Sequence, residues 1–104
     1  MTIQEMENSE PLKFLNIEGT YNKSFWGTKI KVQGRINNKA SVTTYKDAIV
    51  RVIYYSKTKT NIGSRDYTIY EQFLPNSTKP FKLKIDNFKN VNSIGINIIN
   101  ASIK

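Results

Sequence analysis

Apolar and polar residues alternate with a period of two along most of this chain. Between residues 29 and 36, Ile30, Val32 and Ile36 alternate with lysine, glutamine and arginine, which predicts a strand with one buried and one solvated face. Further strand patterns lie near residues 15–21, 45–56, 67–73, 81–86 and 94–101. Polar turns separate these runs, and no segment keeps a helical period. The pattern predicts an all-β fold of six to seven strands, an antiparallel sandwich in preference to a small barrel because the strand lengths are uneven.

The first eleven residues differ from the rest of the chain. They lack periodicity, contain Glu5, Glu7 and Glu10 without any lysine or arginine, and end at Pro11. We interpret residues 1–11 as a flexible leader and residues 12–104 as a single β-sandwich domain. An acidic, polar start is not a signal peptide. No run of 18 apolar residues occurs, so the sequence predicts no transmembrane segment.

The chain is basic, with a formal net charge of +8. Residues 11–104 carry 16 basic and 5 acidic groups, a net charge of +11. Thirteen of the basic residues are lysines, which are spread over most predicted elements. Diffuse lysine predicts weak, salt-sensitive contact with polyanions and no specific recognition of nucleic acid. A small basic barrel that binds nucleic acid is therefore kept only as an alternative.

The residue inventory argues against catalysis. The chain has no cysteine and no histidine, which removes disulfides, thiolate metal sites, cysteine nucleophiles and the commonest general base. The acids outside the leader are isolated from one another: Glu18, Asp47, Asp66, Glu71 and Asp86. The five glycines are scattered, so no phosphate-binding loop is predicted. We expect a protein that is not an enzyme and that has no catalytic residue, cofactor or metal.

The strand at residues 45–56 has two apolar faces. Ala48, Val50, Val52 and Tyr54 form the predicted core side, and the opposite face holds Tyr45, Ile49, Arg51, Ile53 and Tyr55. Tyrosine, isoleucine and arginine are typical of interfaces, and Tyr70 of the next strand could extend this face. The pattern predicts packing against a protein partner or a second copy. Cover by the leader or a loop, or strand propensity alone, would explain it equally.

Two aromatic residues are candidates for stacking on a ligand. Trp26 lies in a polar stretch that is predicted to be a loop, and Tyr21 precedes it on the first strand. Exposed aromatics beside polar residues can stack on sugars or bases. A carbohydrate-binding β-sandwich is therefore an alternative function. The competing interpretation is that Trp26 closes one end of the core.

Three segments between residues 31 and 85 resemble the FxLYD-type immunoglobulin-like domains of bacterial proteins. They are Gly34-Arg35-Ile36-Asn37 at one strand end, the run from Ala48 to Ser56, and the turn and strand from Pro75 to Phe81. Ser56 and Asn76 stand where the family has aspartate and glycine. The resemblance implies an immunoglobulin-like sandwich, without catalytic residues, that acts by protein binding or spacing on an envelope protein. It also implies an extracytoplasmic location in a bacterium.

Overall fold

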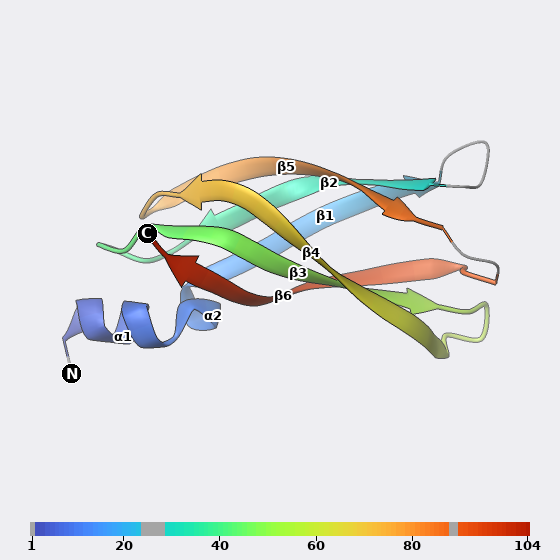
Figure 1. The fold of residues 1–104 in the computed structure, drawn as a ribbon, viewed down its shortest axis with the longest axis horizontal. Coiled ribbons are helices and arrows are strands. Elements are labelled where there is room, and N and C mark those ends of the chain that lie inside the picture. Colours follow the sequence, from blue (N-terminus) through green and yellow to red (C-terminus); the bar gives the residue numbers. More distant parts are fainter. Residues whose placement is uncertain (1, 24–28, 88–89) are drawn as a thin grey trace.

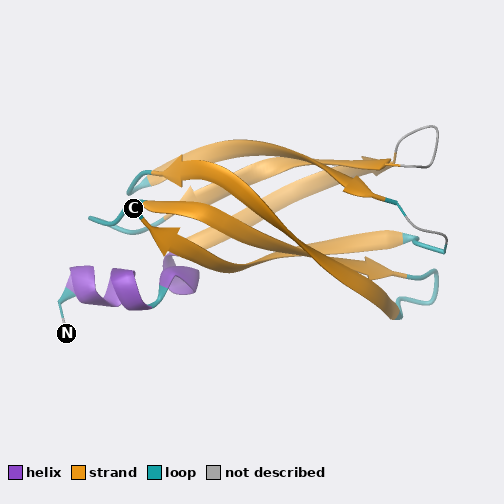
Figure 2. Ribbon diagram, in the orientation of Figure 1, coloured by secondary structure: helices purple, strands orange, loops and turns teal. Residues whose placement is uncertain are grey.

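Strands make up most of the molecule. The computed structural model describes residues 2–23, 29–87 and 90–104. Two short helices lie at the amino-terminal end, α1 (Ile3–Ser9) and α2 (Pro11–Phe14). The strands are β1 (Leu15–Lys23), β2 (Lys29–Asn38), β3 (Tyr45–Tyr55), β4 (Asn61–Phe73), β5 (Ser77–Asp86) and β6 (Ser93–Ile103). The strands run in two layers, while the helices and both chain ends lie toward one end (Figures 1 and 2).

Each layer is a three-stranded antiparallel sheet. The strand orders are β1-β2-β5 and β4-β3-β6, so β2 and β3 are the central strands. Their inward residues alternate as predicted: Ile30, Val32 and Ile36 of β2 and Val50 and Val52 of β3 are all buried. The predicted all-β antiparallel sandwich is confirmed, with six strands in the described residues. In this part of the chain no helix is long and apolar enough to cross a membrane.

A β-bulge near the start of β3 changes which side chains enter the core. The pairing with β4 shifts between Lys46 and Ala48, and Asp47 has a positive φ of 51°. One extra residue reverses the alternation. Tyr45 is therefore on the core side and fully buried. The prediction that Tyr45 shares the outer face with Ile49 is wrong for this reason.

Helix α1 occupies residues that were predicted to lack regular structure. The side chain of Thr2 caps it by accepting a hydrogen bond of 3.1 Å from the Glu5 amide. Glu7 is buried at 1% exposure and hydrogen-bonds to the loop at residues 41–43. The prediction of an irregular leader over residues 1–11 is thus wrong for residues 3–9. A seven-residue helix attached through a carboxylate has no apolar periodicity that could reveal it.

Strands β1 and β2 approach each other closely at a pair of glycines. Gly19 lies directly opposite Gly34, and a Cβ on Gly34 would lie 1.9 Å from the Glu18 carbonyl oxygen and 2.6 Å from the Gly19 Cα. The pairing of β1 with β2 continues without a shift at this point. Gly19 was predicted to mark a bulge, and this is wrong: it marks a close backbone contact.

Candidate functional site

The outer face of the β4-β3-β6 sheet carries most of the predicted interaction residues. Ile49, Ile53 and Tyr55 lie on this face and are half-buried, whereas Arg51 is exposed. Arg51 donates two hydrogen bonds to Asp66 of β4, at 2.9 Å from Nε and 3.2 Å from Nη2. This pair raises the pKa of Arg51 and lowers the pKa of Asp66. We call Ile49, Arg51, Ile53 and Tyr55 the outer strip.

Small neighbours surround the apolar members of the outer strip. Ile53 pairs with Ser64 on β4 and with Gly95 on β6. The Tyr55 ring lies beside Gly95, since a Cβ there would meet the ring at 3.3 Å. Cross-strand contacts of this kind account for the half-burial of the strip. They leave a ridge of Ile53 and Tyr55 between residues too small to cover it.

Tyr70 of β4 is the most exposed large apolar residue in the described part of the chain. Its exposed fraction is 79%, and it points away from the core, as predicted from its alternation with Tyr67 and Ile69. Tyr70 lines an open groove of about 850 Å³. The groove also involves β1, β2 and β5, with polar side chains that include Thr20, Gln33 and Lys82. An aromatic ring beside hydrogen-bonding groups suits a ligand or partner with mixed polarity.

The two predicted stacking aromatics do not form a site in the described residues. Tyr21 is half-buried and packs against the core, so its ring is not presented as an open platform. Trp26 lies outside the described residues. Of the aromatics considered, Tyr70 is the one that stands beside a groove.

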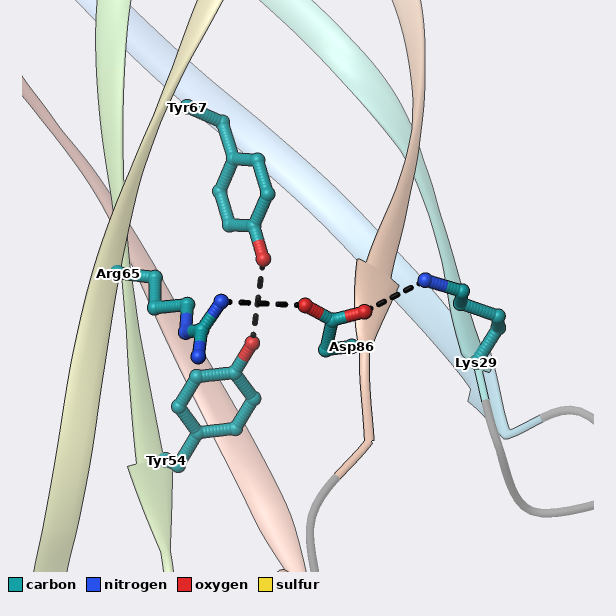
Figure 3. Close-up of polar contacts among 5 residues, drawn as sticks. All are labelled: Lys29, Tyr54, Arg65, Tyr67 and Asp86. Carbon is teal, nitrogen blue, oxygen red and sulfur yellow. Dashed lines mark hydrogen bonds and ion pairs between the residues drawn. The ribbon is translucent and has the colours of Figure 1, made fainter.

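A polar cluster links the two sheets at the opposite end of the sandwich from α1 (Figures 1 and 3). Asp86 of β5 accepts from Lys29 of β2 at 2.5 Å and from Arg65 of β4 at 3.2 Å. The Tyr54 and Tyr67 hydroxyls lie 3.5 Å apart beside this carboxylate. Arg65 and Asp86 come from different sheets, so their ion pair crosses the gap between the layers.

The electrostatics of this polar cluster favour structure over catalysis. Lys29, and secondarily Arg65, lowers the pKa of Asp86, so its carboxylate is ionised and paired at neutral pH. Burial, followed by the hydrogen bond with Tyr67, raises the pKa of Tyr54, so its hydroxyl keeps its proton. Neither group is prepared to act as a base or nucleophile. Sequence reasoning missed this cluster because Lys29 and Asp86 are 57 positions apart.

Most carboxylates in the described residues are committed to a partner. Glu10, Glu18, Asp66, Glu71 and Asp86 hold ion pairs with lysine or arginine, and Glu7 accepts backbone hydrogen bonds. No group of three or more potential metal ligands occurs in this part of the chain. The described acids therefore neutralise cations and fasten segments together.

The outer face of the β1-β2-β5 sheet collects lysines that looked dispersed in the sequence. Lys31 lies directly opposite Lys84, and Lys82 lies opposite Gln33. Lys29 and Arg35 on the same face pair with Asp86 and Glu18. Within the described residues no ion pair involves Lys31, Lys82 or Lys84. We call Lys31, Lys82 and Lys84 the lysine face.

Comparison with known proteins adds no relative to these observations. The chain matches no family model, no curated protein sequence and no solved structure.

Proposed function

We propose that this chain is a non-catalytic, immunoglobulin-like interaction or spacing domain of a bacterial envelope protein. The strand order supports the immunoglobulin-like part. One sheet of such a sandwich has A-B-E neighbours, and the other has C′-C-F neighbours. Taken in chain order, β1, β2 and β5 correspond to A, B and E, and β4, β3 and β6 correspond to C′, C and F. The resemblance to FxLYD-type domains supports the extracytoplasmic location.

The commitment of the carboxylates supports a role other than catalysis. Asp86 is ionised between Lys29 and Arg65, and Tyr54 beside it retains its proton. With no histidine or cysteine in the chain, acid–base chemistry would have to use these paired groups. Breaking a charge pair to free one of them costs free energy that an active site would have to recover.

Tyr70 is the single observation that carries a binding role. A tyrosine that is 79% exposed on a strand, beside an open groove, offers a large apolar surface with a hydroxyl at its end. Interfaces are enriched in tyrosine for this reason. The outer strip provides a second, half-buried apolar surface on the β4-β3-β6 sheet. Both surfaces suit a protein partner.

Photo-crosslinking from position 70 tests this proposal. A photoreactive amino acid replaces Tyr70 in the protein expressed in bacterial cells, and a matched variant carries it at the exposed hairpin residue Lys57. We expect a discrete adduct with one envelope protein from position 70 and none from position 57. Fractionation of the same cells should place the protein outside the cytoplasm. A cytoplasmic protein, or identical adducts from both positions, would contradict the proposal.

The outer strip is tested separately by Ile53→Lys. Light scattering over a range of concentrations reports self-association, and thermal melting reports stability. If the strip is an interface, the variant loses self-association or partner binding while Tm changes little. A large fall in Tm with an unchanged monomer would show that Ile53 serves the fold instead.

Carbohydrate binding is the second candidate function, and the groove is the observation in its favour. Tyr70 could stack on a sugar ring while Thr20 and Gln33, which line the same groove, hydrogen-bond its hydroxyls. A glycan array separates the two functions. Binding to defined glycans that Tyr70→Ser abolishes would favour carbohydrate, and the absence of any binding would favour a protein partner.

A further inference from the structure

The loop at residues 41–43 forms a pocket of hydrogen-bond donors around a carboxylate. The Oε2 atom of Glu7 accepts from the Ser41 amide at 2.9 Å and from the Ser41 hydroxyl at 2.8 Å. Its Oε1 atom accepts from the amides of Val42 at 3.1 Å and Thr43 at 3.0 Å. Consecutive amides that converge on one anion form a nest. We call residues 41–43 the carboxylate nest.

Helix α1 is attached to the rest of the molecule mainly through this carboxylate. Two further polar contacts flank it: the Tyr45 hydroxyl donates to the Glu7 carbonyl at 2.5 Å, and the Thr43 hydroxyl lies 3.3 Å from Asn8 Oδ1. Glu7 is the one buried residue of the helix, and Ile3 is 64% exposed. Helix α1 thus contributes no apolar side chain to the core, so its docking depends on polar contacts that any identical segment could make.

The chain between α1 and α2 provides a joint. Glu10 has φ of −134° and ψ of 64°, outside the helical region, and Pro11 begins α2. A proline at this position cannot continue the hydrogen bonding of the preceding helix. Rotation about Glu10 would therefore move α1 as a unit while α2 and β1 stay in place.

Charge also favours attraction between one copy's α1 and another copy's body. Residues 1–10 carry three glutamates and no cation, whereas residues 11–104 carry a net charge of +11. In addition, Ile3, Met6 and Val42 remain 36% to 64% exposed around the docked helix. These side chains provide apolar surface that a second molecule could cover.

We propose that residues 41–43 are a carboxylate-binding site that helix α1 of a second copy can occupy in place of the chain's own α1. A second copy fits because its Glu7 and Asn8 reproduce every contact of the closed form. Exchange of an identical element then costs mainly the entropy of association. The two nests of an exchanged dimer are each completed by the partner's glutamate.

Mixing two complementary variants of the full chain tests the exchange. Glu7→Ala keeps the nest but removes its occupant, and Ser41→Pro keeps Glu7 but removes the Ser41 amide and hydroxyl. We expect a 1:1 heterodimer by light scattering only when both variants are present. Glu5→Ala is the matched control for Glu7→Ala, because Glu5 is an exposed residue of the same helix, and its mixture with Ser41→Pro should not produce the complementary heterodimer. Val42→Asp, which places a like charge at the nest, replaces Ser41→Pro if circular dichroism shows the proline variant unfolded.

A peptide of residues 1–10 tests the nest itself. Labelled for fluorescence anisotropy, it should bind the Glu7→Ala protein, and a peptide with Gln in place of Glu7 should bind about tenfold or more weakly, because hydrogen bonds to a charged acceptor are the stronger kind. The wild-type protein, whose nest is filled, should bind less peptide than Glu7→Ala. Equal binding of the two peptides would overturn the carboxylate site. Peptide binding without a heterodimer would overturn the exchange between copies.

Discussion

At the scale of single residues, buried polar side chains join segments that the strands alone leave apart. Asn38, at the end of β2, donates to the carbonyls of Thr43 and Phe73 at 3.0 and 2.9 Å and accepts from the Ala40 amide at 2.9 Å. Its side chain therefore fastens the loop after β2 to the end of β4. A fully bonded buried amide stabilises one arrangement of these segments over others.

Asn38→Leu should destabilise the protein strongly. The substitution leaves the carbonyls of Thr43 and Phe73 buried without this donor, and the free energy of unfolding should fall by roughly 3 kcal/mol. Urea denaturation measures this change. The matched control is Asn16→Leu, at an exposed position of β1, which should alter stability by less than about 0.5 kcal/mol. Equal losses for both variants would contradict the role assigned to Asn38.

Glu7 should make stability depend on pH in the acid range. Burial by itself raises its pKa, but hydrogen bonds from Ser41, Val42 and Thr43 outweigh it and lower the pKa from 4.5 to about 2. A carboxyl whose pKa is lower when folded stabilises the protein above its unfolded pKa. The contribution is therefore complete above about 4.5 and is lost as the pH falls from there toward 2.

Urea titrations of wild type and Glu7→Gln between pH 2 and pH 7 check this dependence. The wild type should be more stable at pH 7, and the difference should shrink as the pH falls below 4.5, because glutamine does not titrate. Other carboxylates titrate equally in both proteins, so they cancel from the difference. A difference that stays constant with pH would mean that the nest does not hold an ionised carboxylate.

At the scale of elements, alternation located the strands, and local irregularities set what it could not. Strand β2 needed only its period of two, since every side chain follows it. In β3 the extra residue at Asp47 reversed the direction of Tyr45, and asparagine or aspartate can adopt such a conformation without a distinctive motif. Helix α1 escaped prediction because its docking depends on the carboxylate nest, 34 to 36 positions away. The predicted site residues Ile49, Ile53 and Tyr70 lie beyond the bulge or on another strand, where the period continues to hold.

Gly34→Ala should separate β1 from β2. Its Cβ would lie 1.9 Å from the Glu18 carbonyl oxygen and 2.6 Å from the Gly19 Cα, and two paired backbones cannot both keep their place around it. We expect a loss of about 3 kcal/mol or more in the free energy of unfolding, measured by thermal or urea denaturation.

The matched control for this substitution is Gly95→Ala on β6. Its Cβ would meet the Tyr55 ring at 3.3 Å, which is the far part of a side chain and can shift. Alanine also lowers the entropy of the unfolded chain, so stability should change by less than about 1 kcal/mol. Similar effects at both positions would show that the β1–β2 contact is not specially close.

At the scale of the whole molecule, folding concentrates charge that is diffuse along the chain. The basic residues of β2 and β5 point to one face of the β1-β2-β5 sheet because both strands alternate in the same register. Lys31 and Lys84 are direct cross-strand neighbours, and like charges in such pairs repel. An anionic surface bound to the lysine face would relieve this repulsion, so this face should dominate contact with polyanions.

Charge reversal on the lysine face should weaken retention on DNA more than the same reversal elsewhere. Lys31→Glu with Lys84→Glu and Lys57→Glu with Lys59→Glu change the net charge equally, and the second pair lies in the exposed β3–β4 hairpin. Each phosphate contact that is lost reduces the salt dependence of binding. The first double variant should therefore elute from a DNA column at the lower salt concentration. Equal elution would mean that net charge alone acts, and sequence-specific binding at physiological salt would contradict the interpretation that lysine contacts here are unspecific.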